Sequence, residues 1–538
     1  MSDSRGNEVG GPTAVLDRTI PRTPTTAWGA ARSLPIRMLV LLGILGVAVS
    51  ATGSWIPSLW GDEAASIMSA ERSWESLGRM LSTVDAVHGL YYAILHVWID
   101  LFGASPFSVR FPSAIAIGIA TMGVALLATK LAGRTVGLVA AGVFIILPRV
   151  TYMGMEARSY AMTIALVVWL MVAFIALVSA RERRTMPWVA FGALFALACS
   201  LFIYSSLFIL VFGVVALVMR TDRQTWLRAG IALGSGAFIA LPVVIISYLE
   251  REQIAFLASR SSFNVVGIFV SPWFDNKPLA IISWTLIVAG AVIGAVVLLR
   301  HRAGRVQPSK LVALFRPAAR RLPSLLVVGL AWLVIPTVLL AIGDRFTPLY
   351  SPRYLSFTAP AVAILIAVGI VAIARTVRAK WLVPVLAAAV LAAAIPTWVG
   401  QREPFAKNGG TDWASVASVI AKQAKPGQAI VFDDNTRASR KPRLAKYMYP
   451  EAFAGLVDVG LVTPFQDTDG LWDVAVPAAD STDLVDGYDT VWLSIATPSF
   501  TKTPEQQAEI LPAFEAAGFS ITHEVHLHRT VLYEMTRG

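Results

Sequence analysis

Long apolar runs alternate with short polar connectors along the chain from Pro35 to Val399. The runs are about 20 residues long, the length that a helix needs to cross a hydrocarbon core of about 30 Å. Each run therefore predicts a membrane-spanning helix. We expect eleven spans, near residues 37–56, 109–129, 136–153, 160–180, 188–205, 207–219, 229–248, 279–299, 324–342, 355–374 and 381–399.

The pattern changes after the last span, where acids, prolines and shorter apolar segments appear. Spacing and turn signals there predict alternating helices and strands, over residues 411–425, 429–434, 489–496, 503–518 and 521–536. The expected fold class is a polytopic α-helical membrane protein, with about 11 transmembrane helices plus interfacial helices and with a C-terminal soluble α/β domain.

The connector after the first span, residues 57–106, is too long for a tight turn. Apolar side chains recur with helical spacing in two parts of it, residues 64–81 and 90–102. Two amphipathic helices that lie in the headgroup plane fit this pattern. If residues 90–102 crossed the membrane instead, every later basic connector would change sides.

Composition supports the membrane class. Of the 538 residues, 56% are hydrophobic and 15% are charged, whereas a soluble protein has about 25% charged residues. The single cysteine, Cys199, excludes an internal disulfide and a cysteine-based metal cluster.

Basic residues gather in the connectors on one side of the predicted bundle, at residues 130–134, 181–184, 220–228, 300–321 and 375–380. The positive-inside rule makes this side cytoplasmic. The net charge of +11 is then a topology signal, and we expect no nucleic-acid partner.

This topology divides the chain into three parts. We expect a cytoplasmic N-terminal tail over residues 1–36, a transmembrane catalytic module over 37–400 and an extracytoplasmic α/β domain over 401–538. The tail lacks the pattern of a removable signal peptide, so the first span is expected to remain as an anchor.

Ionisable and aromatic residues collect at the opposite, outward ends of the spans, in four motifs. These are "WGDEAAS" with Asp62 and Glu63, "DAVHGLYY" with Asp85, His88 and Tyr91, "EARSY" with Glu156, Arg158 and Tyr160, and "SPRY" with Arg353 and Tyr354. Ionisable residues at a membrane boundary are candidates for a functional site.

The order of these motifs, with "VRFPSAIA" (109–116) and "SPRYLSF" (351–357), resembles the membrane glycosyltransferases of the C-type fold. It is most similar to the bacterial branch related to protein O-mannosyltransferases and lipid A aminoarabinose transferases, and the resemblance covers residues 37–400. It implies transfer of a sugar from a polyprenyl-phosphate carrier to an acceptor on the outer face. Many relatives have "HPPLYY" where this chain has "HGLYY", which weakens the transfer of a role to His88.

Such a reaction needs a base for the acceptor hydroxyl and a cation for the departing phosphate. Either Asp62 or Glu63 can be the base, while the other orients it or binds a divalent cation. The resemblance favours Asp62, the first acid of the pair. The structural alternative is a solvated acidic pair that ends a helix at the interface.

The other candidates are expected to bind substrate or a cation. Asp85 and His88 can position the acceptor, and Asp62, Glu63 and His88 can hold Mg, Mn or Ca. The structural alternative for His88 is a hydrogen-bonded framework residue.

Arg353 presents planar donors to the donor phosphate, with Arg158 as a second candidate, and Glu156 can touch the sugar. Interhelical ion pairs and interfacial anchoring are the structural alternatives for these three. The tyrosines expected at the substrate are Tyr91, Tyr160 and Tyr354.

We therefore expect an inverting glycosyltransferase of a bacterial plasma membrane. Its partners are a polyprenyl-phosphate sugar, the bilayer and a glycan, lipid or protein acceptor; compositional bias suggests mannose or arabinofuranose as the sugar. The alternatives are a flippase or other transporter of lipid-linked sugars, or a non-catalytic envelope scaffold.

Overall fold

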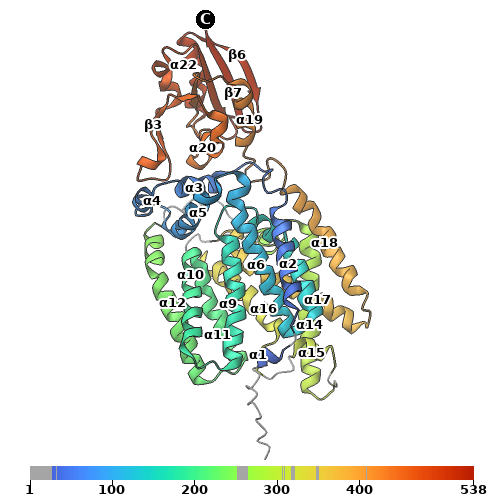
Figure 1. The fold of residues 1–538 in the computed structure, drawn as a ribbon. Helices are drawn as coiled ribbons and strands as arrows, with labels where there is room; N and C mark the ends of the chain where they lie inside the picture. The colour runs from blue at the N-terminus through green and yellow to red at the C-terminus, as the bar shows by residue number, and fades with distance from the viewer. Residues whose placement is uncertain are drawn as a thin grey trace, which may run out of the picture.

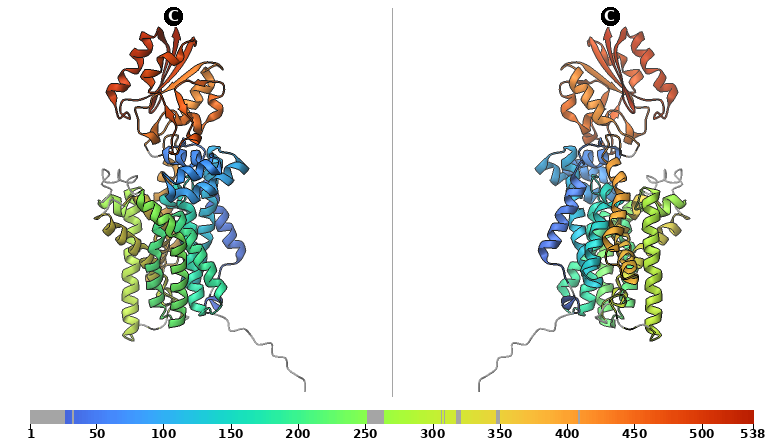
Figure 2. Two further views of the ribbon diagram at one scale, coloured as in Figure 1. Left: turned by 90° about the vertical axis from the view of Figure 1, so that its left-hand side faces the viewer. Right: turned by 90° about the vertical axis from the view of Figure 1, so that its right-hand side faces the viewer.

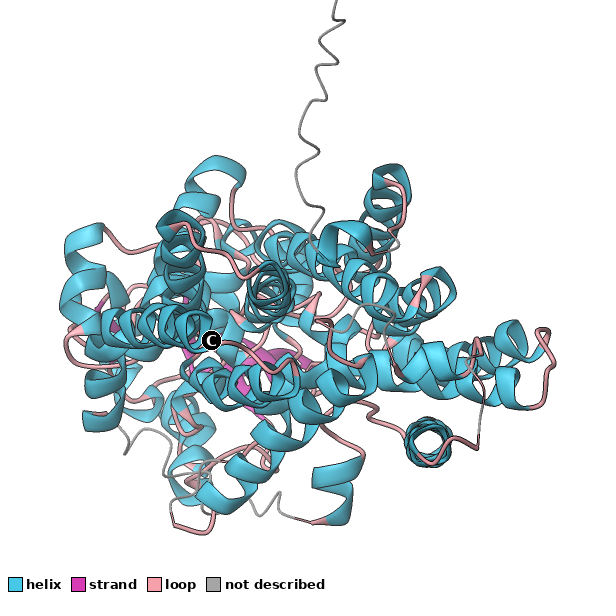
Figure 3. Ribbon diagram, turned by 90° about the horizontal axis from the view of Figure 1, so that it is seen from below, coloured by secondary structure: helices cyan, strands magenta, loops and turns pink. Residues whose placement is uncertain are grey.

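The computed structural model describes residues 27–31, 33–250, 264–305, 307, 309–316, 321–346, 350–407 and 409–538. Most of the expected N-terminal tail, residues 1–26, lies outside the described residues. The chain forms a bundle of helices with a sheet-containing domain at one end (Figure 1). Seen from the other end, many bundle helices are viewed along their axes, and the strands lie behind them (Figure 3).

Each of the eleven expected spans contains a long helix. These helices are α2 (Ile36–Ala51), α6 (Pro106–Ala132), α7 (Arg134–Ile146), α9 (Tyr160–Ala180), α10 (Thr185–Leu201), α11 (Phe208–Val218), α12 (Arg223–Leu249), α14 (Lys277–Arg302), α16 (Leu325–Gly343), α17 (Ala359–Thr376) and α18 (Leu382–Gly400). Within the described residues, seven segments are long and apolar enough to cross a membrane. Four of the eleven helices, α2, α7, α10 and α11, are shorter. The expected fold class is confirmed.

The third expected span is divided into two helices. Helix α7 ends before Leu147, which has extended backbone angles, and α8 (Pro148–Met153) begins at a proline. Proline disfavours a helical conformation in the residue before it and suits the first position of a new helix. The break turns the chain toward the loop that carries Glu156 and Arg158.

Small residues let two bundle helices approach closely. Gly290 of α14 faces Gly369 of α17, and a Cβ on Gly290 would lie 2.8 Å from the Gly369 Cα. Small residues at such crossings are typical of helix packing in membranes.

The connector at residues 57–106 folds into short helices, as the sequence predicts. Instead of one helix over 64–81, the structure has α3 (Gly61–Ala70) and α4 (Trp74–Leu81), followed by η1 (Ala86–His88) and α5 (Gly89–Phe102). Ser73 separates α3 from α4 because its hydroxyl accepts a hydrogen bond from the Ser76 N–H and caps α4. Helices α3 to α5 lie across the end of the bundle, beneath the C-terminal domain (Figures 1 and 2).

The C-terminal domain is built on a five-stranded sheet of order β2-β1-β5-β7-β6. The strands are β1 (Ala429–Phe432), β2 (Val457–Asp458), β5 (Thr490–Ala496), β6 (Phe519–His526) and β7 (Thr530–Arg537). Strand β1 is parallel to β2 and β5, while β7 is antiparallel to β5 and β6. Strands therefore lie in three of the segments predicted from the sequence, 429–434, 489–496 and 521–536.

Other short elements complete the fold. They are α1 (Ala27–Ala30), η2 (Ile203–Leu207), α13 (Val265–Phe269), α15 (Val312–Phe315), η4 (Pro352–Thr358), α19 (Trp413–Gln423), η5 (Ala438–Arg440), α20 (Leu444–Met448), η6 (Pro450–Phe453), β3 (Leu461–Thr463), η7 (Phe465–Asp467), β4 (Val474–Ala475), η8 (Ala478–Val485), α21 (Pro504–Ala508) and α22 (Ile510–Ala516).

The C-terminal domain packs directly on α3 and α4. One apolar cluster joins Ile67 and Met68 of α3 to Leu444 and Phe465 of the domain. At its edge the fully buried Arg72 donates to the backbone oxygens of Thr468, at 2.9 Å, and Gly470, at 2.6 Å. The domain thus holds the helix that begins with Asp62.

We expect Arg72→Met to loosen this contact, because the backbone oxygens of Thr468 and Gly470 lose a charged donor. Hydrogen bonds to charged groups contribute about 1.5 to 3 kcal/mol each. Amide hydrogen exchange over residues 465–472 should accelerate at least about tenfold. Arg183→Met is the control, since Arg183 is exposed and pairs with Asp222 on the surface. Equal exchange in both variants would contradict the assigned role.

Candidate active site

The first turn of α3 presents two carboxylates, Asp62 and Glu63. The N-terminus of a helix stabilises negative charge, because its first N–H groups point outward. Gly61 precedes them at a crowded position, where an added Cβ would collide with the backbone oxygen of Ser439 in η5. The C-terminal domain therefore fixes where this turn lies.

Asp62 lies between two arginines from distant parts of the chain. Arg353 of η4 donates from Nη1 to Asp62 Oδ2, and both side chains are about a quarter exposed, at 23% and 25%. Arg158 donates to the Asp62 backbone oxygen at 3.4 Å and to Ser66 Oγ at 3.3 Å. Burial alone would raise the pKa of Asp62, but the charges of Arg353 and Arg158 outweigh it and hold the pKa below its ordinary value. Asp62 is thus ionised at neutral pH.

Glu63 has a different environment, although it is adjacent in sequence. It is fully buried, and Arg110 of α6 donates to both of its oxygens, at 2.7 and 2.5 Å. The Ala157 N–H adds a third hydrogen bond, at 3.0 Å. Burial raises the pKa of Glu63 but Arg110 lowers it more, so this carboxylate is also ionised.

Arg110 joins three segments, because its remaining N–H groups also find acceptors. They donate to the backbone oxygens of Ser54 at 2.5 Å, Pro57 at 2.8 Å and Ser58 at 3.2 Å. The sequence reasoning missed this residue as a site component. The available signal was a lone arginine in "VRFPSAIA", at the start of an apolar span.

His88 contacts Arg158 instead of a carboxylate. Its Nε2 lies 2.7 Å from Arg158 Nη2 and must accept, because a guanidinium can only donate. Burial, followed by the charge of Arg158, lowers the pKa of His88 to about 4. Asp85 lies nearby with a positive φ of 63° and accepts from the Tyr92 hydroxyl at 2.5 Å. A neutral His88 therefore helps to orient Arg158.

Three buried polar atoms next to this cluster have no hydrogen-bond partner among the described residues. They are Tyr91 Oη, Glu156 Oε2 and Arg158 Nε. Buried polar groups normally have a partner, which can be water or a ligand. Unsatisfied donors and acceptors side by side are what a hydroxyl-rich ligand requires.

Lys407, from the segment after α18, is a second residue that the sequence reasoning missed. It is 2% exposed, donates to the Met155 backbone oxygen at 2.8 Å and lies 4.3 Å above the Tyr152 ring. Burial lowers the pKa of Lys407 to about 8, and Glu63 and Glu156 oppose that shift. Burial raises the pKa of Glu156, against the effect of Lys407.

Aromatic rings surround Arg353 on its other side. The Tyr354 ring lies 5.8 Å from the Arg353 guanidinium and 5.4 Å from the Tyr204 ring. Tyr160 contacts the same group through Phe202, at 5.6 Å. The predicted Tyr160 and Tyr354 thus lie together beside the predicted phosphate ligand, and Phe202 and Tyr204 are additions from the structure.

The residues predicted for a cation do not converge. Asp62 faces Arg353, Glu63 faces Arg110 and His88 faces Arg158. Across the described part of the chain, no group of three or more His, Cys, Asp or Glu side chains is placed to hold a metal ion. This donor set does not fit Mg, Mn or Ca, and no step below runs through a metal.

Residues 90–248 match the family model of dolichyl-phosphate-mannose-protein mannosyltransferase. The comparison with curated proteins finds no match. Among solved structures, ArnT from Cupriavidus metallidurans bound to undecaprenyl phosphate is similar with a TM-score of 0.51 and 13% identity, covering 93% of this chain and 98% of that one.

Two further structures are similar with lower scores. The Archaeoglobus fulgidus oligosaccharyltransferase, in complex with Zn and sulfate, has a TM-score of 0.43 and 11% identity, covering 92% of this chain and 72% of that one. The mycobacterial arabinofuranosyltransferase AftD has a TM-score of 0.46 and 16% identity, covering 96% and 40%.

The bundle, the lateral helices and the C-terminal sheet domain have the fold of ArnT. The resemblance predicted from the sequence is thereby confirmed. The chain is a membrane-embedded protein of the C-type glycosyltransferase fold, and its residues 90–248 match the model of a mannosyltransferase family.

Proposed function

We propose that the protein transfers a sugar from a polyprenyl-phosphate donor to an acceptor hydroxyl at the extracytoplasmic face of a bacterial plasma membrane. The observation that carries the proposal is the convergence of Arg158 and Arg353 on Asp62, at the end of the bundle beneath the C-terminal domain. A carboxylate and two guanidinium groups supply the base and the phosphate ligands that this reaction needs.

The donor phosphate binds Arg353 in this proposal. Arg353 is partly exposed at the beginning of a segment that is long and apolar enough to cross a membrane, and lipid phosphates lie near the ends of such segments. Its planar donors match phosphate oxygens. Tyr160 and Tyr354 border the same place and offer rings to the sugar or the first prenyl units. The similar structure of ArnT contains bound undecaprenyl phosphate, which belongs to the class of ligand proposed here.

Asp62 is the base. The acceptor oxygen attacks the anomeric carbon, its proton passes to Asp62, and the bond from that carbon to the phosphate oxygen breaks. The phosphate leaves on the lipid, with its new charge held by Arg353 and Arg158. One displacement inverts the anomeric configuration. When the phosphate engages Arg353, Asp62 loses part of its cationic neighbour and becomes a stronger base.

The remaining residues position these groups. Glu63, held by Arg110, fixes the start of α3, while His88 of η1 contacts Arg158 and Asp85 accepts a hydrogen bond from Tyr92. The unsatisfied atoms of Tyr91 and Glu156 are placed for sugar hydroxyls. In this proposal the transferred sugar is mannose or arabinofuranose, and the acceptor is a glycan, lipid or protein.

The test is transfer of radiolabelled sugar by the purified protein from a panel of polyprenyl-phosphate sugars to envelope acceptors. We expect one donor to support transfer with inverted configuration. Donor movement across vesicles without transfer would replace the enzyme by a transporter. A protein that neither transfers nor binds any donor would be a scaffold.

Arg353→Lys should raise the KM for the donor by about tenfold or more, because an ammonium group cannot make the paired contacts of a guanidinium. Steady-state kinetics at varied donor concentration measures the change. Arg79→Lys, at an exposed position on the same end of the molecule, is the matched control. An unchanged KM would remove Arg353 from the donor site.

The pH dependence tests the state of Asp62. Because its pKa is lowered, Asp62 stays ionised at a pH where an ordinary aspartate is already protonated, and kcat/KM should fall only at still lower pH. With donor bound, the phosphate raises the pKa of Asp62, so the acidic limb of kcat should lie at a higher pH than that of kcat/KM. If kcat and kcat/KM fell at the same acidic pH, Arg353 would not shift from Asp62 to the phosphate when the donor binds.

A further inference from the structure

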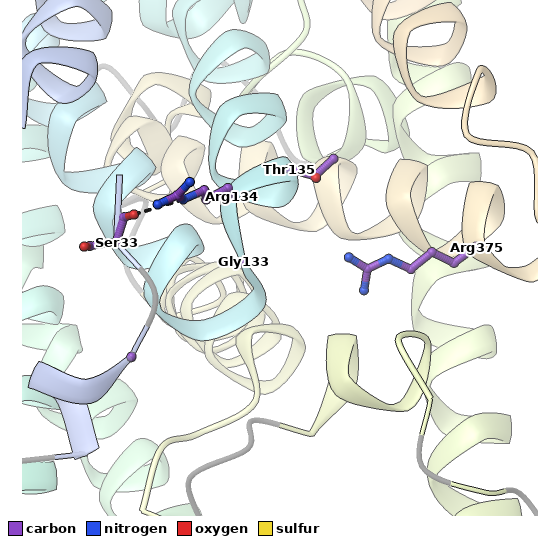
Figure 4. A pocket seen from close by; sticks show the side chains of 6 residues that line it. Ser33, Gly133, Arg134, Thr135 and Arg375 are labelled. Carbon is purple, nitrogen blue, oxygen red and sulfur yellow. Dashed lines mark hydrogen bonds between the residues drawn. The ribbon is translucent and has the colours of Figure 1, made fainter. Parts of the chain in front are cut away.

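The ammonium group of Lys407 is buried, although it belongs to the segment that follows α18. Lys407 is 2% exposed, and its Nζ donates one hydrogen bond, to the Met155 backbone oxygen at 2.8 Å. An exposed cation can make such a contact without leaving water. In the pocket at the turn between α6 and α7, the exposed Arg134 donates from Nε to the Ser33 backbone oxygen at 3.2 Å (Figure 4). Lys407 makes the same kind of contact at a buried position, where a charged group is unfavourable.

The surroundings of Lys407 compensate only part of this burial. Among the described residues, no carboxylate forms an ion pair with it. The charged groups that act on it come from four segments and are Glu63, Glu156, Arg110 and Arg402. The two carboxylates favour the ammonium form, the two guanidinium groups oppose it, and the Tyr152 ring lies 4.3 Å from Nζ. Burial outweighs the attractions and lowers the pKa of Lys407 to about 8. The fold therefore keeps a cation at a position where an apolar side chain would suit it better.

The hydrogen bond from Lys407 reaches the loop that carries two site residues. Residues 154–159 join α8 to α9 and include Glu156 and Arg158. Ser113 Oγ donates to the Glu156 backbone oxygen at 2.7 Å, one residue after the oxygen that Lys407 holds. Lys407 thus fixes the backbone directly before Glu156, while its charge acts on the Glu156 carboxyl group.

The carboxyl group of Glu156 depends on this charge. Its Oε2 is buried and has no hydrogen-bond partner among the described residues. Burial raises the pKa of Glu156, Lys407 is the strongest influence that lowers it, and the two carboxylates of α3 raise it further. An ionised carboxylate only accepts hydrogen bonds, and it accepts them more strongly than a neutral carboxyl group. The ammonium group therefore favours the form of Glu156 that binds a hydroxyl group as an acceptor.

We propose that Lys407 is a positioning residue for sugar transfer: it holds the loop at Met155 and keeps the Glu156 carboxylate ionised to accept a hydrogen bond from a hydroxyl group of the transferred sugar. This assignment rests on the proposed transferase function. Lys407 acts through Glu156 and does not touch the substrate. A cation that the fold disfavours is expected where function requires one, because functional sites often lower stability.

Lys407→Met separates this role from a framework role. Methionine has nearly the same length and no charge, so release of the buried charge offsets the lost hydrogen bond, and the Tm in detergent should stay near the wild-type value. The kcat for sugar transfer should fall about tenfold or more, because Glu156 loses both its position and its preferred form. Lys422→Met, at an exposed position in the last turn of α19, is the control and should change neither quantity. A Lys407→Met protein that fails to fold, or that folds and transfers sugar at the full rate, would overturn the assignment.

A double-variant cycle tests whether Lys407 acts through Glu156. Glu156→Gln should itself lower kcat, and the addition of Lys407→Met should cause less than about a twofold further loss, because glutamine has no charge for the ammonium group to preserve. Losses that multiply, as those of independent residues do, would contradict the assignment.

The pH profile provides a readout that a framework lysine would not change. As the pH rises through about 8, Lys407 loses its proton, and kcat/KM of the wild type should fall. Lys407→Arg stays charged and should remove this basic limb. A limb that persists in Lys407→Arg would overturn the assignment. If the wild type transferred no sugar from any polyprenyl-phosphate donor, the proposed function would fail and this role with it. If the wild type and Lys407→Met transferred sugar equally, the function would stand and only the role of Lys407 would fall.

Discussion

Asp62→Asn is expected to lower kcat for sugar transfer by about 10² to 10⁴-fold, the contribution of a positioned general base. Asparagine keeps an oxygen for Arg353, so the local geometry survives, but it cannot take the proton of the acceptor hydroxyl. Donor binding should remain, because the phosphate contacts belong to Arg353 and Arg158. Single-turnover transfer with a radiolabelled donor, together with donor binding, separates these two steps.

The control is Asp100→Asn, the same chemical change on α5. Asp100 is exposed, and its carboxylate lies 3.4 Å from His96 Nε2. If a folded Asp62→Asn protein transferred sugar at the full rate, another residue would have to be the base. Glu156 is buried, and its Oε2 has no hydrogen-bond partner among the described residues, which makes Glu156→Gln the next variant.

The bundle could be predicted well because its signal is local. Each apolar run is unfavourable in water whatever the rest of the chain does, and the structure contains a helix in each of the eleven predicted spans. The breaks inside runs were harder to place. The interruption at Leu147 follows from Pro148, whereas the separation of α3 from α4 depends on a cap at Ser73.

The site was accessible to prediction at the level of residue types. Charges at one end of the spans identified Asp62, Arg158 and Arg353, which the structure brings together. The sequence could not distinguish the roles of Asp62 and Glu63, because two adjacent carboxylates look alike. Their environments differ through residues distant in sequence: Arg353 pairs with Asp62, whereas Arg110, 47 residues after Glu63, pairs with Glu63.

The place of Lys407 in the site could not be predicted from the sequence either. A lysine just beyond the last span reads as a solvated linker residue, but here it is buried against Met155 and Tyr152. Its position requires the chain to return from α18 over the loop that carries Glu156. The charge of Lys407 acts on Glu156 there, which makes the linker part of the site's electrostatics.

Arg110→Met should produce the largest loss of stability in the chain. The substitution leaves the Glu63 carboxylate buried without its counter-ion and leaves three backbone oxygens, of Ser54, Pro57 and Ser58, without their donor. Breaking a buried pair in this way costs about 3 to 5 kcal/mol. Thermal unfolding in detergent should show a strongly lowered Tm or no folded protein. Arg183→Met, which removes a surface pair with Asp222, should cost less than about 1 kcal/mol.

A second substitution distinguishes a framework role from a catalytic one. Glu63→Leu combined with Arg110→Met removes both charges, and a buried pair replaced by apolar residues regains much of the stability lost on breaking it. Recovery of the Tm in the double variant, with sugar transfer still detectable, would establish Glu63 as a positioning residue for Asp62. Recovery of the Tm with transfer as low as in Asp62→Asn would instead show that the Glu63 carboxylate acts on the substrate.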